Sequence, residues 1–224
     1  MKKSSHSSSN RGVRSSSNFT RGSVHSKSRS RARAARVNPE WLKDFFSEML
    51  AVERGGIQLY EKALENLAHE DLRSKLEHFH QETERHVELC EQLLDAAGGD
   101  ENNPGPGAEA AEHKAHGLLT AEVPEEMVDI NNIENLVLAE TKDNWNWEML
   151  GLLIDKVENG DLKKMASRAV REVRKQESSH LAWSQKTLTQ LVLEAAQRND
   201  QMETSDGTRP KDLDVEGEEA EAAD

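Results

Sequence analysis

Residues 162–192 read LKKMASRAVREVRKQESSHLAWSQKTLTQLV. Its apolar side chains recur every three or four residues, which is the period of one face of an α-helix. Between Val173 and Leu181 the same face carries Glu177 and His180. A carboxylate on a buried face is costly unless it is paired or bound to a metal, so this helix is expected to bury a polar site.

Three earlier stretches share the helical period. With the stretch above, they predict helices over 38–68, 70–97, 125–158 and 161–198. Asn38 and Pro39 suit the first turn of the first helix. Gly98 is predicted to end the second helix, and Asp161 is predicted to cap the fourth. The alternation typical of strands is absent from the sequence, so the fold class is predicted to be all-α.

The connections between these helices predict a topology. The first and second helices, like the third and fourth, are separated by about two residues, so each pair is expected to form an antiparallel hairpin. Residues 98–124 separate the two hairpins. This linker is long enough to run back along the whole bundle, and a disordered loop is the alternative. Two hairpins joined by one long crossover make a four-helix bundle.

Acidic or histidine side chains also interrupt the apolar faces of the other three helices. Glu53 does so in the first helix, His86 in the second and Glu140 in the third. Each of these residues, like Glu177, lies about 14 to 16 residues from the start of its helix. In an antiparallel bundle of such helices all four positions reach the middle, so the sequence predicts one shared carboxylate–histidine site.

The pattern resembles the ferritin-like di-iron carboxylate superfamily, which includes rubrerythrins and bacterioferritins. In that family the first and third helices each supply a Glu, and the second and fourth each supply Glu-x-x-His. Glu53 and Glu140 match the single carboxylates, and residues 177–180, ESSH, match the complete motif. Residues 80–99, HQETERHVELCEQLLDAAGG, resemble stress-associated bacterial ferritin-like proteins. The resemblance implies a ferritin-like four-helix bundle over 37–200.

The second helix departs from the family pattern. Thr83 stands three residues before His86, where the family has a Glu. Glu82 lies near the same face and is a substitute ligand, unless it is simply solvated at the edge of the apolar stripe. Because Thr83 has a neutral hydroxyl, the half-site that contains His86 is expected to bind metal less tightly than the half-site on the third and fourth helices.

Other side chains near the predicted site have alternative roles. Asp143, three residues after Glu140, is a candidate for a second carboxylate on that helix. Tyr60 and Trp147 each follow a candidate ligand by seven residues, which suits core packing and also electron transfer near a metal. Residues 77–80 form another Glu-x-x-His, but they lie two turns from the predicted height, which favours a surface role.

The resemblance implies a metal site made of Glu53, Glu82, His86, Glu140, Glu177 and His180. Carboxylates with imidazoles and open positions suit iron, with manganese as the alternative metal. The implied activity is oxidation of Fe(II) by dioxygen or peroxide, in iron handling or in oxidative-stress defence, and a homo-oligomer is compatible with it. The alternative is a non-enzymatic helical bundle with a degraded site, which acts as a stress or interaction protein through charged tails.

Charge divides the chain into three regions. Residues 1–36 hold ten Lys or Arg, twelve Ser and no acidic residue, whereas residues 201–224 hold nine acidic and two basic residues. Both compositions predict disorder, because they offer too little apolar surface to bury. The basic segment is expected either to bind DNA weakly and without sequence preference or to serve as a solubilising tail against the acidic remainder of the chain.

Two further features limit the class of protein. Cys90 is the single cysteine, so an intramolecular disulfide is excluded. No apolar run approaches the length of about 18 to 20 residues that spans a bilayer, and no apolar stretch follows the basic N-terminus as in a secretory signal. A soluble cytoplasmic protein is therefore the expectation.

Overall fold

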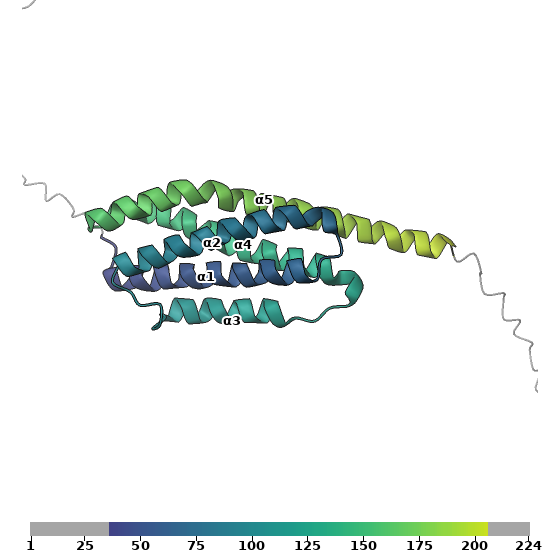
Figure 1. Ribbon diagram of the computed structural model, residues 1–224, viewed down its shortest axis with the longest axis horizontal. Helices are drawn as coiled ribbons and strands as arrows, with labels where there is room; N and C mark the ends of the chain where they lie inside the picture. Colours follow the sequence, from purple (N-terminus) through teal and green to yellow (C-terminus); the bar gives the residue numbers. More distant parts are fainter. Residues whose placement is uncertain (1–35, 206–224) are drawn as a thin grey trace, which may run out of the picture. The chain divides into compact units, whose positions relative to one another are not determined.

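The computed structural model describes residues 36–205, with side chains described to residue 197, and every regular element in this range is helical. The α-helices are α1 (Pro39–Glu65), α2 (Arg73–Ala96), α3 (Pro106–Thr120), α4 (Val128–Leu153) and α5 (Gly160–Ser205) (Figure 1). Short 3-10 turns lie at Glu70–Leu72, Glu125–Met127 and Ile154–Lys156. The predicted all-α class is thus confirmed for the described residues. The predictions for the basic arm fall on residues outside this range, as do those for most of the acidic tail.

The ends of the helices follow the local sequence, with one correction. The Asn38 side chain accepts a hydrogen bond of 3.0 Å from the Glu40 amide, and Pro39 opens α1, as predicted. Gly98, with φ of 76°, follows the end of α2. At α5 the cap is Asn159, because its Oδ1 accepts from the amides of the second and third helical residues at 3.1 and 3.2 Å. Asp161 is already inside the first turn and pairs with Lys164 instead.

Four of the helices pack as two hairpins. Helix α1 packs on α2 and α4 packs on α5, and the hairpins meet where α1 contacts α4 and α2 contacts α5. Helix α5 extends beyond the ends of the other three, seven residues past the predicted end at 198 (Figure 1).

The apolar interior of this body is divided into two clusters. One includes Phe46, Met49, Leu93, Trp147 and Val173, and the other includes Leu59, Tyr60, Leu76, Phe79, Leu136 and Leu191. Along every one of the four helices, buried acidic or histidine side chains lie between the members of one cluster and those of the other; Asp129, near the start of α4, is the buried acid that lies outside this layer. The fold therefore holds a polar layer between two water-excluding apolar layers.

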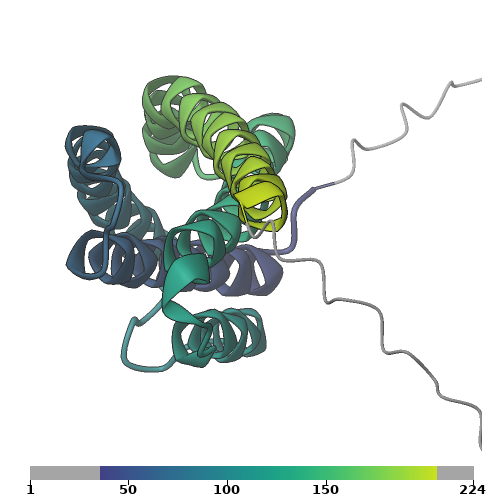
Figure 2. The ribbon, with the colours of Figure 1, turned by 90° about the vertical axis from the view of Figure 1, so that its right-hand side faces the viewer.

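The segment between the hairpins contains a helix that the sequence did not predict. Helix α3 packs along α1, outside the ring formed by the other four helices (Figure 2). Its buried positions are Ala108 and Ala111, so it lacks the stripe of large apolar residues that marks the other helices. None of the described helices combines the length and the apolar composition needed to cross a membrane.

Close packing of α3 on α1 depends on Gly55. A Cβ atom added there would lie 2.9 Å from the Cβ of Ala115, which is fixed to the α3 backbone. We expect Gly55→Val to force the two helices apart and to lower the free energy of unfolding by about 1–3 kcal/mol in chemical denaturation. Gly117→Ala on α3 is the matched control, since no atom lies within 4 Å of its added Cβ. It should stabilise by about 0.5–1 kcal/mol, and equal losses in both variants would contradict the close approach.

Candidate metal centre

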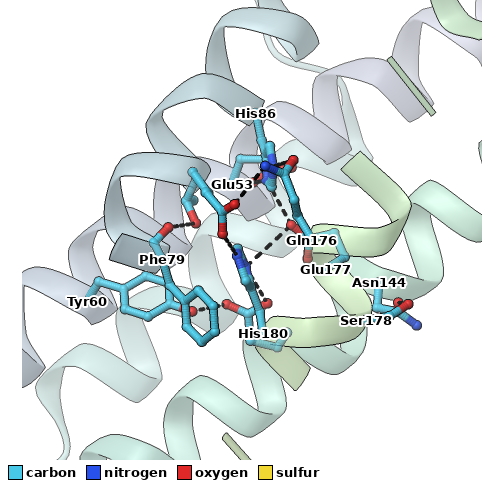
Figure 3. A network of polar contacts seen from close by, with 12 residues as sticks. Glu53, Tyr60, Phe79, His86, Asn144, Gln176, Glu177, Ser178 and His180 are labelled. Carbon is cyan, nitrogen blue, oxygen red and sulfur yellow. Dashed lines mark hydrogen bonds and ion pairs between the residues drawn. The ribbon is translucent and has the colours of Figure 1, made fainter. Parts of the chain in front are cut away.

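The polar layer consists of four carboxylates and two imidazoles. All six side chains are between 0% and 6% exposed. They are Glu53 of α1, His86 of α2, Glu140 and Asp143 of α4, and Glu177 and His180 of α5. Each of the four packed helices therefore contributes to one buried volume, which Figure 3 shows around His86, Glu177 and His180.

Glu177 lies between the two histidines. Its Oε1 is 2.7 Å from Nδ1 of His86 and 3.7 Å from Nδ1 of His180. The two imidazole rings are nearly parallel, with an angle of 24° between them and their centroids 5.8 Å apart. Glu53 completes the His86 side, where its Oε2 lies 3.5 Å from Nδ1, and Glu140 completes the His180 side at the same distance.

These contacts form two groups of donor atoms that share Glu177. Glu53, His86 and Glu177 make one group, and Glu140, Glu177 and His180 make the other. In each group the three potential ligand atoms all lie within 4.8 Å of one another. A carboxylate shared by two such groups is suited to bridge a pair of cations.

The layer contains many buried polar atoms that accept or donate no well-aligned hydrogen bond and meet only one another. They are Glu53 Oε2, His86 Nδ1, Glu140 Oε2, Asp143 Oδ1, Glu177 Oε1 and Oε2, and His180 Nδ1. Each unsatisfied buried group costs about 1–3 kcal/mol, and more when it is charged. All but one of these atoms belong to the two donor groups, so the residues present fit a pair of bound cations.

Hydrogen bonds at the rear of the imidazoles turn both Nδ1 atoms inward. Nε2 of His86 donates to Oε1 of Gln176 at 3.1 Å, and Nε2 of His180 donates to Oε2 of Glu82 at 2.9 Å. The Gln176 amide also donates to Oε1 of Glu82 at 2.7 Å, which joins the two bonds into one chain. Nδ1 of each ring is therefore the atom left to bind a metal.

Two aromatic side chains hold the carboxylates of the opposite hairpin. The Tyr60 hydroxyl of α1 donates to Oε1 of Glu140 at 2.6 Å, and the Trp147 indole of α4 donates to Oε1 of Glu53 at 2.7 Å. Both rings are fully buried. In each case the second oxygen of the carboxylate is the one left without a hydrogen bond. Each carboxylate is thus oriented with one free oxygen in the polar layer.

The charges in the layer shift its pKa values strongly. Burial lowers the pKa of His86, but the adjoining carboxylates of Glu177 and Glu53 outweigh this and raise it to about 11. Burial and the charge of Glu140 raise the pKa of Glu177 to about 8, against the opposing effect of His86. Burial and the charges of Glu53, Glu177 and Glu140 raise the pKa of Asp143. In the metal-free protein, these side chains therefore hold protons in the same volume in which cations would bind.

Five of the six residues predicted as ligands, all but Glu82, lie together in the two donor groups. The Glu82 carboxylate lies behind His180, on the side of the ring away from Nδ1, and hydrogen bonds from His180 and Gln176 lower its pKa despite partial burial. Thr83 is buried and its hydroxyl donates to the Phe79 carbonyl at 3.0 Å. The Glu-x-x-His of residues 77–80 lies outside both donor groups, as predicted. The sequence did not predict that Gln176 would bond both His86 and Glu82, although Gln176 directly precedes Glu177 in the chain.

Comparison of the chain with models of known protein families, with curated proteins and with solved structures yields no match.

The hydrogen bonds of Gln176 are expected to support metal binding by the two imidazoles. Gln176→Leu should remove the acceptor for His86 and the donor to Glu82, and weaken metal binding by about 10–100-fold, as changes to the groups that orient ligands do. Calorimetric titration of the metal-free protein with Mn(II) measures the change. Ser179→Ala, at an exposed position on the same helix, should bind like the wild type. Unchanged affinity in Gln176→Leu would show that the imidazoles need no such support.

The raised pKa values predict how stability depends on pH. Folded His86 and Glu177, with pKa values of about 11 and about 8, bind protons more tightly than their unfolded forms. Their stabilisation is therefore complete below the unfolded pKa values and is lost as pH rises through the folded ones. In chelator, the melting temperature should fall between about pH 5.5 and about pH 8, and Glu177→Gln should flatten this slope. A slope that is the same in both proteins would contradict the assignment.

Proposed function

We propose that the body of the chain is a ferritin-like four-helix bundle that binds two iron ions and oxidises Fe(II). Support for the bundle comes from the packing of two hairpins and from the crossover, part of which is α3, lying along α1. The order of the ligands along the chain adds to this, since the carboxylates of α1 and α4 and the histidines of α2 and α5 follow the resemblance. The observation that carries the proposal is the pair of buried donor groups that share Glu177.

The metal proposed follows from the donor chemistry. The two groups offer carboxylate oxygens and imidazole nitrogens and no sulfur. Such donors suit iron and manganese, and a bridging carboxylate suits two ions rather than one. Cys90 is buried, and burial with the charge of Glu53 raises its pKa, so it stays a thiol in the apolar cluster beside the site.

The chain's own residues prepare this site for ions that change charge. Tyr60 and Trp147 fix the carboxylates of Glu140 and Glu53, so these ligands need little rearrangement. The apolar clusters on either side exclude water. Bound iron would supply the electrons: two Fe(II) ions deliver two, enough to reduce peroxide to water or dioxygen to peroxide with two protons. The enzyme class proposed is a ferroxidase or peroxidase.

Iron titration tests the proposal. The metal-free, full-length protein should bind two Fe(II) per chain without oxygen, and addition of dioxygen or peroxide should then produce the absorbance of Fe(III) faster than in buffer. Glu177→Gln should slow this step by about 100-fold or more, because the shared ligand is lost. Glu172→Gln, at an exposed position of the same helix, is the matched control. A wild-type protein that binds no stoichiometric iron or manganese would favour the alternative of a bundle with a degraded site.

A further inference from the structure

We propose that Asp143 supplies the fourth carboxylate of the metal centre, in place of the Glu that α2 lacks at Thr83. This inference rests on the proposed function and deepens it, because it assigns a ligand that the family pattern does not contain.

The position of Asp143 is that of a ligand without a partner. It is 6% exposed and lies one helical turn after Glu140, so both side chains project from the same face of α4. Its Oδ1 is buried and has no hydrogen-bond partner. The groups around it are the carboxyls of Glu53, Glu177 and Glu140, with Glu53 in hydrogen-bonding reach. The adjacent cation, Lys142, is engaged with Glu48 at 2.6 Å and is directed elsewhere.

Helix α2 has no carboxylate to offer at the corresponding place. Thr83 takes the family position of the Glu, and its hydroxyl is used in a bond to the Phe79 carbonyl of its own helix. Glu82 is occupied by Nε2 of His180 and by the Gln176 amide. The remaining buried carboxylate of the layer is that of Asp143 on α4, which interacts with the charges of Glu53, Glu177 and Glu140.

Charge balance supports the same assignment. Glu53, Glu140, Asp143 and Glu177 are the carboxylates of the buried layer. With neutral imidazoles, these four charges neutralise two divalent cations completely. Without Asp143 the buried centre would hold one uncompensated positive charge, which is costly in an apolar interior. Each donor group holds two carboxylates and one imidazole, and Asp143 would add a third carboxylate on the His86 side. The expectation of a weak half-site at His86, which followed from Thr83, is thereby replaced by one of two tight sites.

Stoichiometry of Mn(II) binding tests the assignment without any measurement of activity. Titration of full-length, metal-free protein, with free Mn(II) followed by electron paramagnetic resonance, should give two tight sites in the wild type. Asp143→Asn should retain one tight site and weaken the other by about 100-fold or more. The double variant Thr83→Glu with Asp143→Asn, which moves the carboxylate back to α2, should restore the second site.

A matched control separates a ligand from a structural aspartate. Asp129 is an equally buried residue of α4, but its carboxylate accepts hydrogen bonds from the Ala68 and His69 amides. Asp129→Asn should keep two Mn(II) sites and melt at a lower temperature in chelator. Asp143→Asn should melt at or above the wild type in chelator, because an unpaired buried carboxylate is removed.

The outcomes distinguish this inference from the function on which it rests. Two tight Mn(II) sites in Asp143→Asn, or a loss of metal-free stability like that of Asp129→Asn, would overturn the role of Asp143 and leave the two-metal centre standing. A wild type that binds no Mn(II) and no Fe(II) would overturn the two-metal centre itself.

Discussion

Glu177 lies without exposed surface between the imidazoles of His86 and His180, and the rest of the interior depends on this arrangement. A carboxylate there is tolerated only if positive charge, protons or metal ions accompany it. The side chains packed on both sides of the layer are apolar, so water does not solvate the charge of this carboxylate. The outer hydrogen bonds through Gln176 and Glu82 then decide which nitrogen of each ring faces the shared carboxylate.

Sequence reasoning located most of this layer because its signal is a contrast. Glu53, His86, Glu140 and Glu177 each interrupt a stripe of large apolar residues, and equal distances from the helix starts were enough to bring them to one height. Helix α3 gave no such contrast, since it buries alanines. Glu82 shows what the position of a residue around a helix cannot predict. Its place near the buried face of α2 did not reveal that its carboxylate binds Nε2 of His180, on the side of the ring away from the polar layer.

Asp143 illustrates a different limit. Its spacing from Glu140 placed it on the right face, but a helical wheel gives no depth and no count of partners. The structure adds that Asp143 is buried and that its Oδ1 atom has no hydrogen-bond partner. A family pattern defined helix by helix would record Thr83 as a lost ligand. The folded chain presents four carboxylates in one layer, from α1, α4 and α5.

The hydrogen bonds of Tyr60 and Trp147 have a consequence for folding. They join residues 80 and 94 positions apart in the chain, and each crosses from one hairpin to the other. Contacts within a hairpin are far more local and close with less loss of chain entropy. Neither hairpin alone contains both histidines or both ends of either aromatic bond. The polar layer is therefore complete only when the two hairpins are docked, and a hairpin on its own would present its share of the ligands, two from the first and four from the second, to solvent.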